Sequence, residues 1–268
     1  IDVDKQAVKL SHAPLCLFQT LDACTDSFLA RQQELVFQNC PEVLLIPCHI
    51  EDNRFHVHPD QFFQYNRPDE VDELLQSLCS QTYRNFEVVV VEDGSAIPCK
   101  QVVKKYTEML DVHYFEKPNS GPGQTRNYAA ERSRGEYLLI LDSDCILPET
   151  YLAAVEAELQ REPADAFGGP DRAHDSFSDV QKAINYAMTS FFTTGGIRGG
   201  KKKMDKFYPR SFNMGVRAEV YKALGGFSAM RFGEDIDFSI RIFKGGYRCR
   251  LFPEAWVWHK RRTDLKKF

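Results

Sequence analysis

The sequence predicts an α/β fold in which a mostly parallel β-sheet is flanked by helices. Two apolar runs, 86–91 and 136–141, have the composition of strands that are buried on both faces, and each ends in acidic residues. Segments with the apolar spacing of helices lie between and after these runs. Strands that alternate with helices in this way are typical of a doubly wound sheet with right-handed crossovers.

The individual elements follow from local patterns. A helix at 67–78 begins with Pro68 and two acids and then places apolar residues on one side. A helix at 124–132 follows two glycines, and one at 217–224 ends before Gly225 and Gly226. The other expected helices are 27–38, 100–110, 148–161, 179–194 and 234–243, and the other expected strands are 43–47, 112–115, 164–168 and 248–252.

Composition narrows the class of protein. The 268 residues carry a formal net charge of -4, which gives no whole-chain reason to expect a nucleic-acid partner. The eight cysteines form no Cys-x-x-Cys pair, so they favour a reducing compartment over a zinc site or a disulfide framework. No apolar run reaches the ~20 residues of a membrane span, and the first residues lack the plan of a signal peptide. We therefore expect a cytoplasmic protein.

Acidic residues directly after apolar strands are the strongest chemical signal. Ligands of open α/β sheets bind at the carboxyl ends of strands, where Glu92 and Asp93 follow one run and Asp142 and Asp144 follow another. Two carboxylates there can share a nucleoside diphosphate, with one accepting a ribose hydroxyl and the other holding Mg²⁺ or Mn²⁺. The alternative is that Asp142 and Asp144 only form a turn or cap a helix.

Three further features could carry chemistry. Gly121 and Gly123 open a helix that contains Arg126, which suits a phosphate or base, although they can equally be ordinary turn residues. Because they do not form the dinucleotide-binding glycine fingerprint, a nicotinamide dehydrogenase is poorly supported. Glu234 and Asp235 begin another helix, where they either match the helix dipole or supply a general base.

Histidines and basic clusters leave alternatives open. His259 is either a satisfied histidine at a strand end or a metal ligand. Lysines at 201–206 and basic residues at 260–267 are either solvated surface or a patch that faces phosphates or an anionic membrane. Together with residues 186–192, the basic C-terminus leaves a peripheral membrane contact open, at the inner face of the membrane.

Taken in order, these segments resemble glycosyltransferase family 2. The resemblance runs from Tyr65 to the end of the chain, and the string LDSD at 141–144 is its most specific part. The other matching strings are YNRP (65–68), QTY (81–83), VVEDGS (90–95), GPGxxRN (121–127), GEYLLI (135–140), GGF (225–227), GED (233–235) and HxxR (259–262).

The resemblance implies a GT-A, Rossmann-like fold and an inverting transfer of sugar from a nucleoside-diphosphate sugar, with UDP preferred. Glu92 and Asp93 would then lie by the nucleobase and ribose, Arg126 by the base or diphosphate, and Asp142 by the ribose. Asp144 and His259 would hold Mn²⁺ or Mg²⁺. Asp235 would be the general base, with Glu234 beside it. The expected acceptor is a glycan or a lipid-linked hydroxyl in cell-surface polysaccharide synthesis.

The expected organisation is a poorly defined N-terminal segment at 1–40 and one GT-A glycosyltransferase domain at 41–268, with a nucleotide-binding half (41–147) and an acceptor half (148–268). One departure from the family lies before Tyr65, where 58–64 reads as a poor central strand, so we expect 43–47 to be the first core strand. A nucleotidyltransferase and a non-catalytic nucleotide-sugar-binding module are the alternative functions. A nucleotidyltransferase usually needs a glycine-rich loop after the first strand, and 48–53 offers none.

Overall fold

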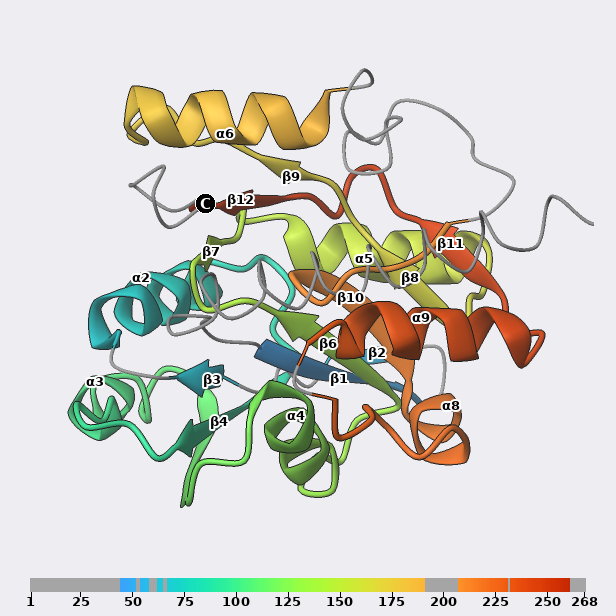
Figure 1. Ribbon diagram of the computed structural model, residues 1–268, viewed down its shortest axis with the longest axis horizontal. Coiled ribbons are helices and arrows are strands. Elements are labelled where there is room, and N and C mark those ends of the chain that lie inside the picture. The colour runs from blue at the N-terminus through green and yellow to red at the C-terminus, as the bar shows by residue number, and fades with distance from the viewer. Residues whose placement is uncertain are drawn as a thin grey trace, which may run out of the picture. The chain divides into compact units, whose positions relative to one another are not determined.

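Three β-sheets form the framework of the fold, seen in a computed structural model that describes residues 44–51, 54–57, 62–64, 67–190, 207–230 and 232–260 (Figure 1). These residues belong to one compact unit, Pro41–Lys266. The largest sheet has the strand order β11-β8-β10-β6-β1-β2. Its strands are β1 (Leu44–Glu51), β2 (Arg54–Val57), β6 (Tyr137–Leu141), β8 (Ala166–Gly168), β10 (Asn213–Arg217) and β11 (Cys249–Leu251).

The two smaller sheets have three strands each. One sheet is β3-β4-β5, made of β3 (Phe62–Gln64), β4 (Glu87–Asp93) and β5 (Asp111–Lys117). The other is β7-β12-β9, made of β7 (Cys145–Ile146), β12 (Val257–His259) and β9 (Asp171–Arg172). The helices are α2 (Pro68–Cys79), α3 (Lys100–Lys104), α4 (Pro122–Ala130), α5 (Tyr151–Arg161), α6 (Asp179–Thr189), α8 (Ala218–Ala223) and α9 (Glu234–Lys244).

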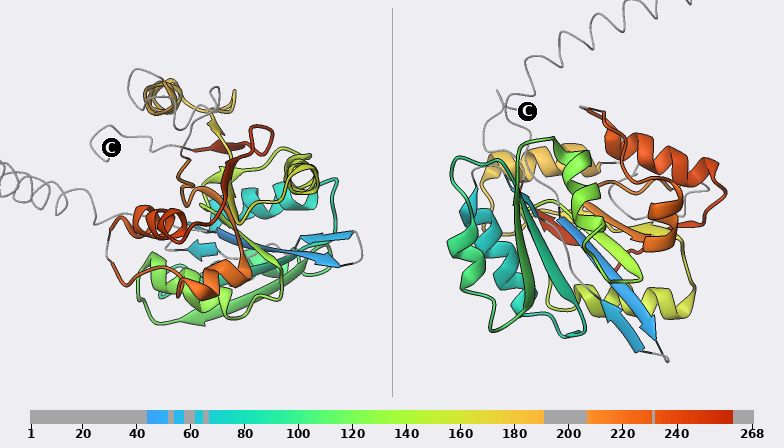
Figure 2. Two further views of the ribbon diagram at one scale, coloured as in Figure 1. Left: turned by 90° about the vertical axis from the view of Figure 1, so that its right-hand side faces the viewer. Right: turned by 90° about the horizontal axis from the view of Figure 1, so that it is seen from below.

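Strand β4 shows why its sequence is apolar throughout. All of its residues are buried, and successive side chains of a strand point to opposite faces. Val88 and Val90 join the core that includes α2 and α3, whereas Val89 and Val91 pack with Ala129 of α4. Helices therefore cover both faces of this parallel sheet, as Figure 2 shows from below. A run without polar alternation is the expected sequence for such a strand.

Strand β6 lies between two cores in the same manner. Leu139 and Leu141 belong to the core that contains α5, and Leu138 and Ile140 belong to the one that contains Phe238 of α9. Its neighbours β1 and β10 are both antiparallel to it. The acids that follow β6 therefore start from a strand that is fixed on both faces and along both edges.

The predicted α/β class is confirmed, but the strand directions are more mixed than expected. The β3-β4-β5 sheet is parallel, whereas the large sheet has a single parallel pair, β8 with β11. A strand lies at Leu44–Glu51, where the sequence predicts one at 43–47, but it runs antiparallel to β6. The strand that pairs with β4 is β3 (Phe62–Gln64), within the segment 58–64 that reads as a poor central strand. The two-residue connection between β1 and β2 explains their antiparallel pairing.

Most other predicted elements are present with adjusted ends. Helix α3 ends at Lys104 rather than 110, and α6 is described to Thr189 rather than 194. Strand β10 was not predicted from the sequence. The helix expected at 27–38 lies outside the described residues. Over the part of the chain that the structure describes, no helix combines the length and the apolar character needed to cross a bilayer.

Asn127 joins α4 to the loop that precedes α9. Its Oδ1 accepts hydrogen bonds from the Phe227 backbone N–H at 2.8 Å and the Tyr221 hydroxyl at 2.7 Å, and its Nδ2 donates to the Phe227 carbonyl at 2.8 Å. The neighbouring Gly226 has a φ of 66°, and a Cβ there would lie 2.3 Å from Asn127 Oδ1. The strings GPGxxRN and GGF are therefore two halves of one structural contact.

We expect Asn127→Ala to destabilise the fold by about 1–3 kcal/mol, because it leaves partly buried donors without their acceptor. Urea unfolding followed by circular dichroism measures this change. Glu131→Ala, at the exposed end of the same helix, should change the free energy of unfolding by less than about 0.5 kcal/mol. Equal stability of the two variants would contradict the assignment.

Candidate active site

The small β7-β12-β9 sheet brings three predicted or potential ligands together. The turn after β6 places Asp144 just before Cys145 of β7, which pairs with His259 of β12. His259 Nε2 lies 3.0 Å from Asp144 Oδ1 and 3.8 Å from Asp142 Oδ2. One ligand atom each of Asp144, Cys145 and His259 lie within 4.8 Å of one another. The structure thus brings Asp142 and Asp144 next to His259, which lies more than a hundred residues further along the sequence.

The electrostatics of this cluster favour an added positive charge. Burial raises the pKa of Asp142 to about 7; His259 and Arg126 oppose this shift, and the neighbouring carboxylates of Asp144 and Asp235 add to it. Within the described residues, Asp142 Oδ1 is buried without a hydrogen-bond partner. A buried carboxylate oxygen of this kind is stabilised by a cation or a donor group. The donor set of carboxylate oxygen and imidazole nitrogen fits Mn²⁺, and its oxygens fit Mg²⁺.

Helix α9 places the other two predicted acids in different environments. Glu234 is 8% exposed, and its Oε1 accepts a hydrogen bond of 2.7 Å from Nη1 of Arg126, which is 3% exposed. Asp235 Oδ2 accepts from Arg210 Nε at 2.8 Å, and its Oδ1 accepts from the Ile236 backbone N–H at 2.8 Å. Glu234 is therefore committed to a buried ion pair, whereas Asp235 is only partly buried.

A glycine allows α4 to approach α9 closely. A Cβ on Gly123 would lie 3.0 Å from the Ser228 carbonyl oxygen and 3.3 Å from Cγ of Glu234. This contact sets Arg126, one turn further along α4, against Glu234 and over the ring of Phe227, at 4.7 Å. Arg126 and Asp235 are both near enough to Asp142 to shift its pKa.

Glu92 and Asp93 end β4 on opposite sides and contact the starts of two helices. Asp93 is fully buried; it forms an ion pair with Lys117 and accepts 3.0 Å hydrogen bonds from the Ser120 and Gly121 backbone N–H groups before α4. Glu92 Oε2 accepts from the Cys99 backbone N–H at 2.9 Å, ahead of α3. Asp93 therefore has no carboxylate face open to a ligand, whereas Glu92 Oε1 is buried without a hydrogen-bond partner among the described residues.

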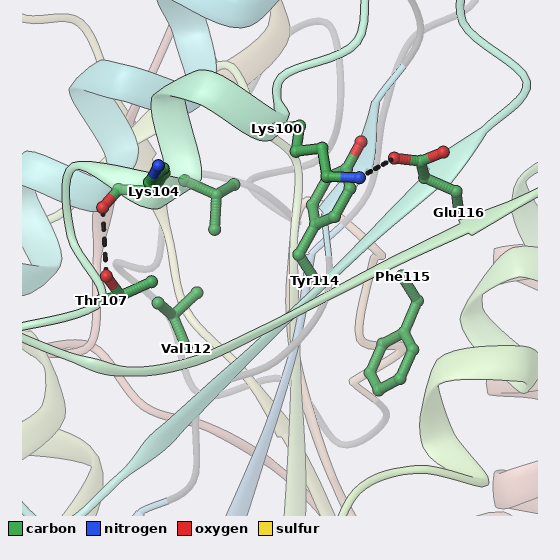
Figure 3. A pocket seen from close by; sticks show the side chains of 8 residues that line it. Lys100, Lys104, Thr107, Val112, Tyr114, Phe115 and Glu116 are labelled. Atoms are coloured by element: carbon green, nitrogen blue, oxygen red, sulfur yellow. Dashed lines mark hydrogen bonds and ion pairs between the residues drawn. The ribbon is translucent and has the colours of Figure 1, made fainter.

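Two grooves lie along the β3-β4-β5 sheet. The first, of about 350 Å³, is lined by Glu92, Gly94, Ser95, Pro98, Glu116, Lys117 and Pro118. The second, of about 510 Å³, lies between α3 and β5, where Lys100 is paired with Glu116 at 3.2 Å and the Tyr114 ring stands beside them (Figure 3). Neither groove is lined by Asp142 or Asp144. The groove at Glu92 is the one that a nucleobase could enter beside a predicted site residue.

Sequence reasoning did not single out Asp171 or Arg210. Asp171 begins β9, and its Oδ2 lies 3.6 Å from His259 Nδ1. It follows the short strand β8 and Gly169-Pro170, so the rule that selects acids after strands could have found it. Arg210 lies in an irregular segment, and its contact with Asp235 spans 25 residues, so no local signal marks it.

Comparison with known proteins identifies the family. The sequence pattern described as "Glycosyl transferase family 2" matches residues 64–225, more than half of the chain. The chain belongs to glycosyl transferase family 2. Among curated relatives, a glycosyltransferase of Haemophilus influenzae is 29% identical over 188 residues, which are 67% of this chain and 60% of that protein. The poly(ribitol-phosphate) beta-N-acetylglucosaminyltransferase TarS of Staphylococcus aureus is 36% identical over 105 residues, 38% of this chain and 18% of TarS.

Two solved glycosyltransferase structures share the fold of this chain. The TarS fragment 1–349 in complex with UDP-GlcNAc superposes with a TM-score of 0.59 at 23% identity, covering 78% of this chain and 59% of the fragment. The mannosyltransferase PcManGT of Pyrobaculum calidifontis, in complex with GDP-Man and Mn²⁺, has a TM-score of 0.59 at 20% identity, covering 77% and 57%. The predicted GT-A-type fold is thereby confirmed. The chain spans less than two thirds of the length of these relatives.

Proposed function

We propose that this family 2 chain transfers a sugar, with inversion, from a nucleoside-diphosphate sugar to a hydroxyl of a glycan or lipid-linked acceptor. The observation that carries the proposal is the convergence of Asp142, Asp144 and His259 after β6, within electrostatic reach of Arg126 and Asp235. Such an arrangement offers separate groups for a diphosphate and for an acceptor proton. UDP is the preferred donor nucleotide, and cell-surface polysaccharide synthesis is the proposed setting.

Asp144 and His259 are the residues that would hold Mn²⁺ or Mg²⁺, because their donor atoms lie 3.0 Å apart, with Asp144 in the turn before β7 and His259 on the neighbouring strand β12. A bound divalent cation supplies positive charge that stabilises a departing diphosphate. Asp142 is placed to accept a ribose hydroxyl, because its side chain is 20% exposed beside the metal-binding pair. Glu92 lines the smaller groove and is the predicted residue that a nucleobase would lie beside there.

Arg126 and Asp235 are the residues that would act on the diphosphate and on the acceptor hydroxyl. Glu234 fixes the Arg126 guanidinium, so its charge can face the diphosphate without a reorganisation of the side chain. Each oxygen of Asp235 accepts one hydrogen bond and keeps a further lone pair, so the carboxylate can still take the proton of an acceptor hydroxyl. Glu234 is better suited to holding Arg126 than to proton transfer.

The solved relatives support a nucleotide-sugar donor but differ in the base, since one was crystallised with UDP-GlcNAc and another with GDP-Man. We further propose that residues 41–147 form the nucleotide-binding half and 148–268 the acceptor half of one domain. The proposed location is the cytoplasm, at the inner face of a membrane, where lipid-linked acceptors are exposed.

Isothermal titration with UDP, GDP and TDP, each with and without Mn²⁺, tests the donor site. We expect one diphosphate to bind tightly only with Mn²⁺, and Asp144→Ala to weaken that binding by about 10-fold or more, because it removes a metal ligand. Asp175→Ala, an exposed aspartate outside the cluster, is the control. Absence of any nucleotide binding, or wild-type binding by Asp144→Ala, would contradict the proposal. Mn²⁺-dependent hydrolysis of the bound donor distinguishes an enzyme from a binding module.

A further inference from the structure

Asp171 is a buried acid outside the set that sequence reasoning selected. It begins β9, and its side chain has no exposed surface. Strand β9 runs parallel to β12, with Asp171 opposite Val257, two residues before His259. Removing a carboxylate from water is costly unless a cationic or hydrogen-bonding partner faces it. The position of Asp171 therefore requires such a partner, and the imidazole of His259 lies next to it.

The imidazole of His259 is held between two carboxylates. Its Nδ1 lies 3.6 Å from Asp171 Oδ2, and its Nε2, on the opposite edge of the ring, lies 3.0 Å from Asp144 Oδ1. The ring also stacks on Phe212, with centroids 5.3 Å apart and an angle of 21° between the planes. The stacking sets the plane of the ring, and in this plane each nitrogen faces one of the two carboxylates.

We propose that Asp171 is a positioning residue that keeps the proton of His259 on Nδ1, so that Nε2 presents its lone pair toward Asp144 as a ligand for a divalent cation. A carboxylate that accepts from the second ring N–H both sets the tautomer of a metal-binding histidine and makes it a better ligand. The inference rests on the proposed metal site and adds a residue to it.

The first test measures cation affinity rather than turnover. Free Mn²⁺, followed by electron paramagnetic resonance, is titrated with the wild-type protein, Asp171→Asn and the control Asp175→Asn, the same substitution on an exposed aspartate four residues away. We expect Asp171→Asn to weaken Mn²⁺ binding by about 10- to 100-fold, the usual effect of losing such a partner. The control should bind as the wild-type protein does. Circular dichroism establishes that each variant is folded at the temperature of the titration.

The second test identifies the metal-bound nitrogen in the wild-type protein, and only its assignment and its comparison of exchange rates use variants. The protein is labelled with ¹⁵N-histidine and loaded with Zn²⁺ as a diamagnetic probe, and His259→Gln assigns the signal of His259 among the seven histidines. We expect His259 to show a metal-bound Nε2 and a slowly exchanging Nδ1–H. Coordination through Nδ1, or an exchange rate that is the same in Asp171→Asn, would overturn the inference.

The two proposals fail in different ways. If the wild-type protein binds no Mn²⁺, or if Asp144→Ala binds it unchanged, the metal site itself is wrong and the role of Asp171 falls with it. If the wild-type protein binds Mn²⁺ through Asp144 and Asp171→Asn binds it equally well, only the role of Asp171 is overturned. A purely structural Asp171 would lower stability without changing either the Mn²⁺ affinity or the nitrogen that is bound.

Discussion

Asp235→Asn is expected to lower kcat of sugar transfer by about 10²- to 10⁴-fold, the usual contribution of a positioned general base. Asparagine has nearly the same shape and can still accept one of the two hydrogen bonds, from Arg210 Nε or from the Ile236 backbone N–H, but it cannot take a proton from an acceptor hydroxyl. Because Asp235 is proposed to act on the acceptor, the affinity for the nucleotide donor should change little. Steady-state kinetics with varied acceptor, together with titration of the donor nucleotide, separates the two effects.

Asp237→Asn is the matched control, since it makes the same change two residues further along α9. Asp237 is paired with Arg241 at 2.9 Å and its side chain is 31% exposed, so the substitution should leave kcat unchanged. If Asp235→Asn kept more than about a tenth of the activity, the contribution expected of a base would be missing. Loss of donor binding together with kcat would instead place Asp235 in the donor site.

Patterns of burial made much of the fold predictable. Strands β4 and β6 are covered on both faces, and this leaves an unbroken apolar run such as 88–91. Helices with one buried side, such as α2 and α9, leave apolar residues at helical spacing. Acids that end such strands could be located in the same way, because the carboxyl end of a strand in an α/β sheet is a recurrent ligand position.

Strand direction and long-range contacts were not predictable, because neither leaves a local pattern. Strand β1 has an apolar composition that fits a parallel or an antiparallel neighbour equally, and its pairing with β6 is set by the whole sheet. The ion pair of Arg126 with Glu234 joins residues 108 positions apart. The sequence therefore suggests a ligand for Arg126 and a chemical role for Glu234, whereas the structure pairs them with each other.

Glu92 and Asp93 illustrate the limit of the strand-end rule. Two consecutive residues of a strand face opposite sides, so the rule locates both acids but cannot decide which side receives a ligand. In the structure, Asp93 is enclosed by Lys117 and the backbone before α4, and the groove lies beside Glu92. The side that receives a ligand is decided by the end of β5 and the loop at 118–121, whose conformation is not evident from its own sequence.

The buried pair of Arg126 and Glu234 is expected to have a large effect on stability. Their side chains are 3% and 10% exposed, so removing one partner leaves the other charge buried and unpaired. We expect Arg126→Met and Glu234→Leu each to lower the free energy of unfolding by about 3–5 kcal/mol. The double variant should be much more stable than the sum of the two losses predicts, because it leaves no unpaired charge. Urea unfolding of the four proteins measures the coupling.

The pair of Lys100 and Glu116 provides the comparison, since its atoms are 3.2 Å apart but its side chains are 64% and 54% exposed. The corresponding two single variants and double variant at Lys100 and Glu116 should give a coupling free energy of at most about 1 kcal/mol. If the stability losses of the Arg126 and Glu234 variants simply added in the double variant, the two side chains would not be coupled, and this would contradict the buried ion pair. Donor binding then separates structure from function in the double variant. If Arg126 serves the diphosphate, the double variant recovers stability without recovering donor affinity, because stability needs only the absence of an unpaired charge, whereas donor binding needs the guanidinium itself.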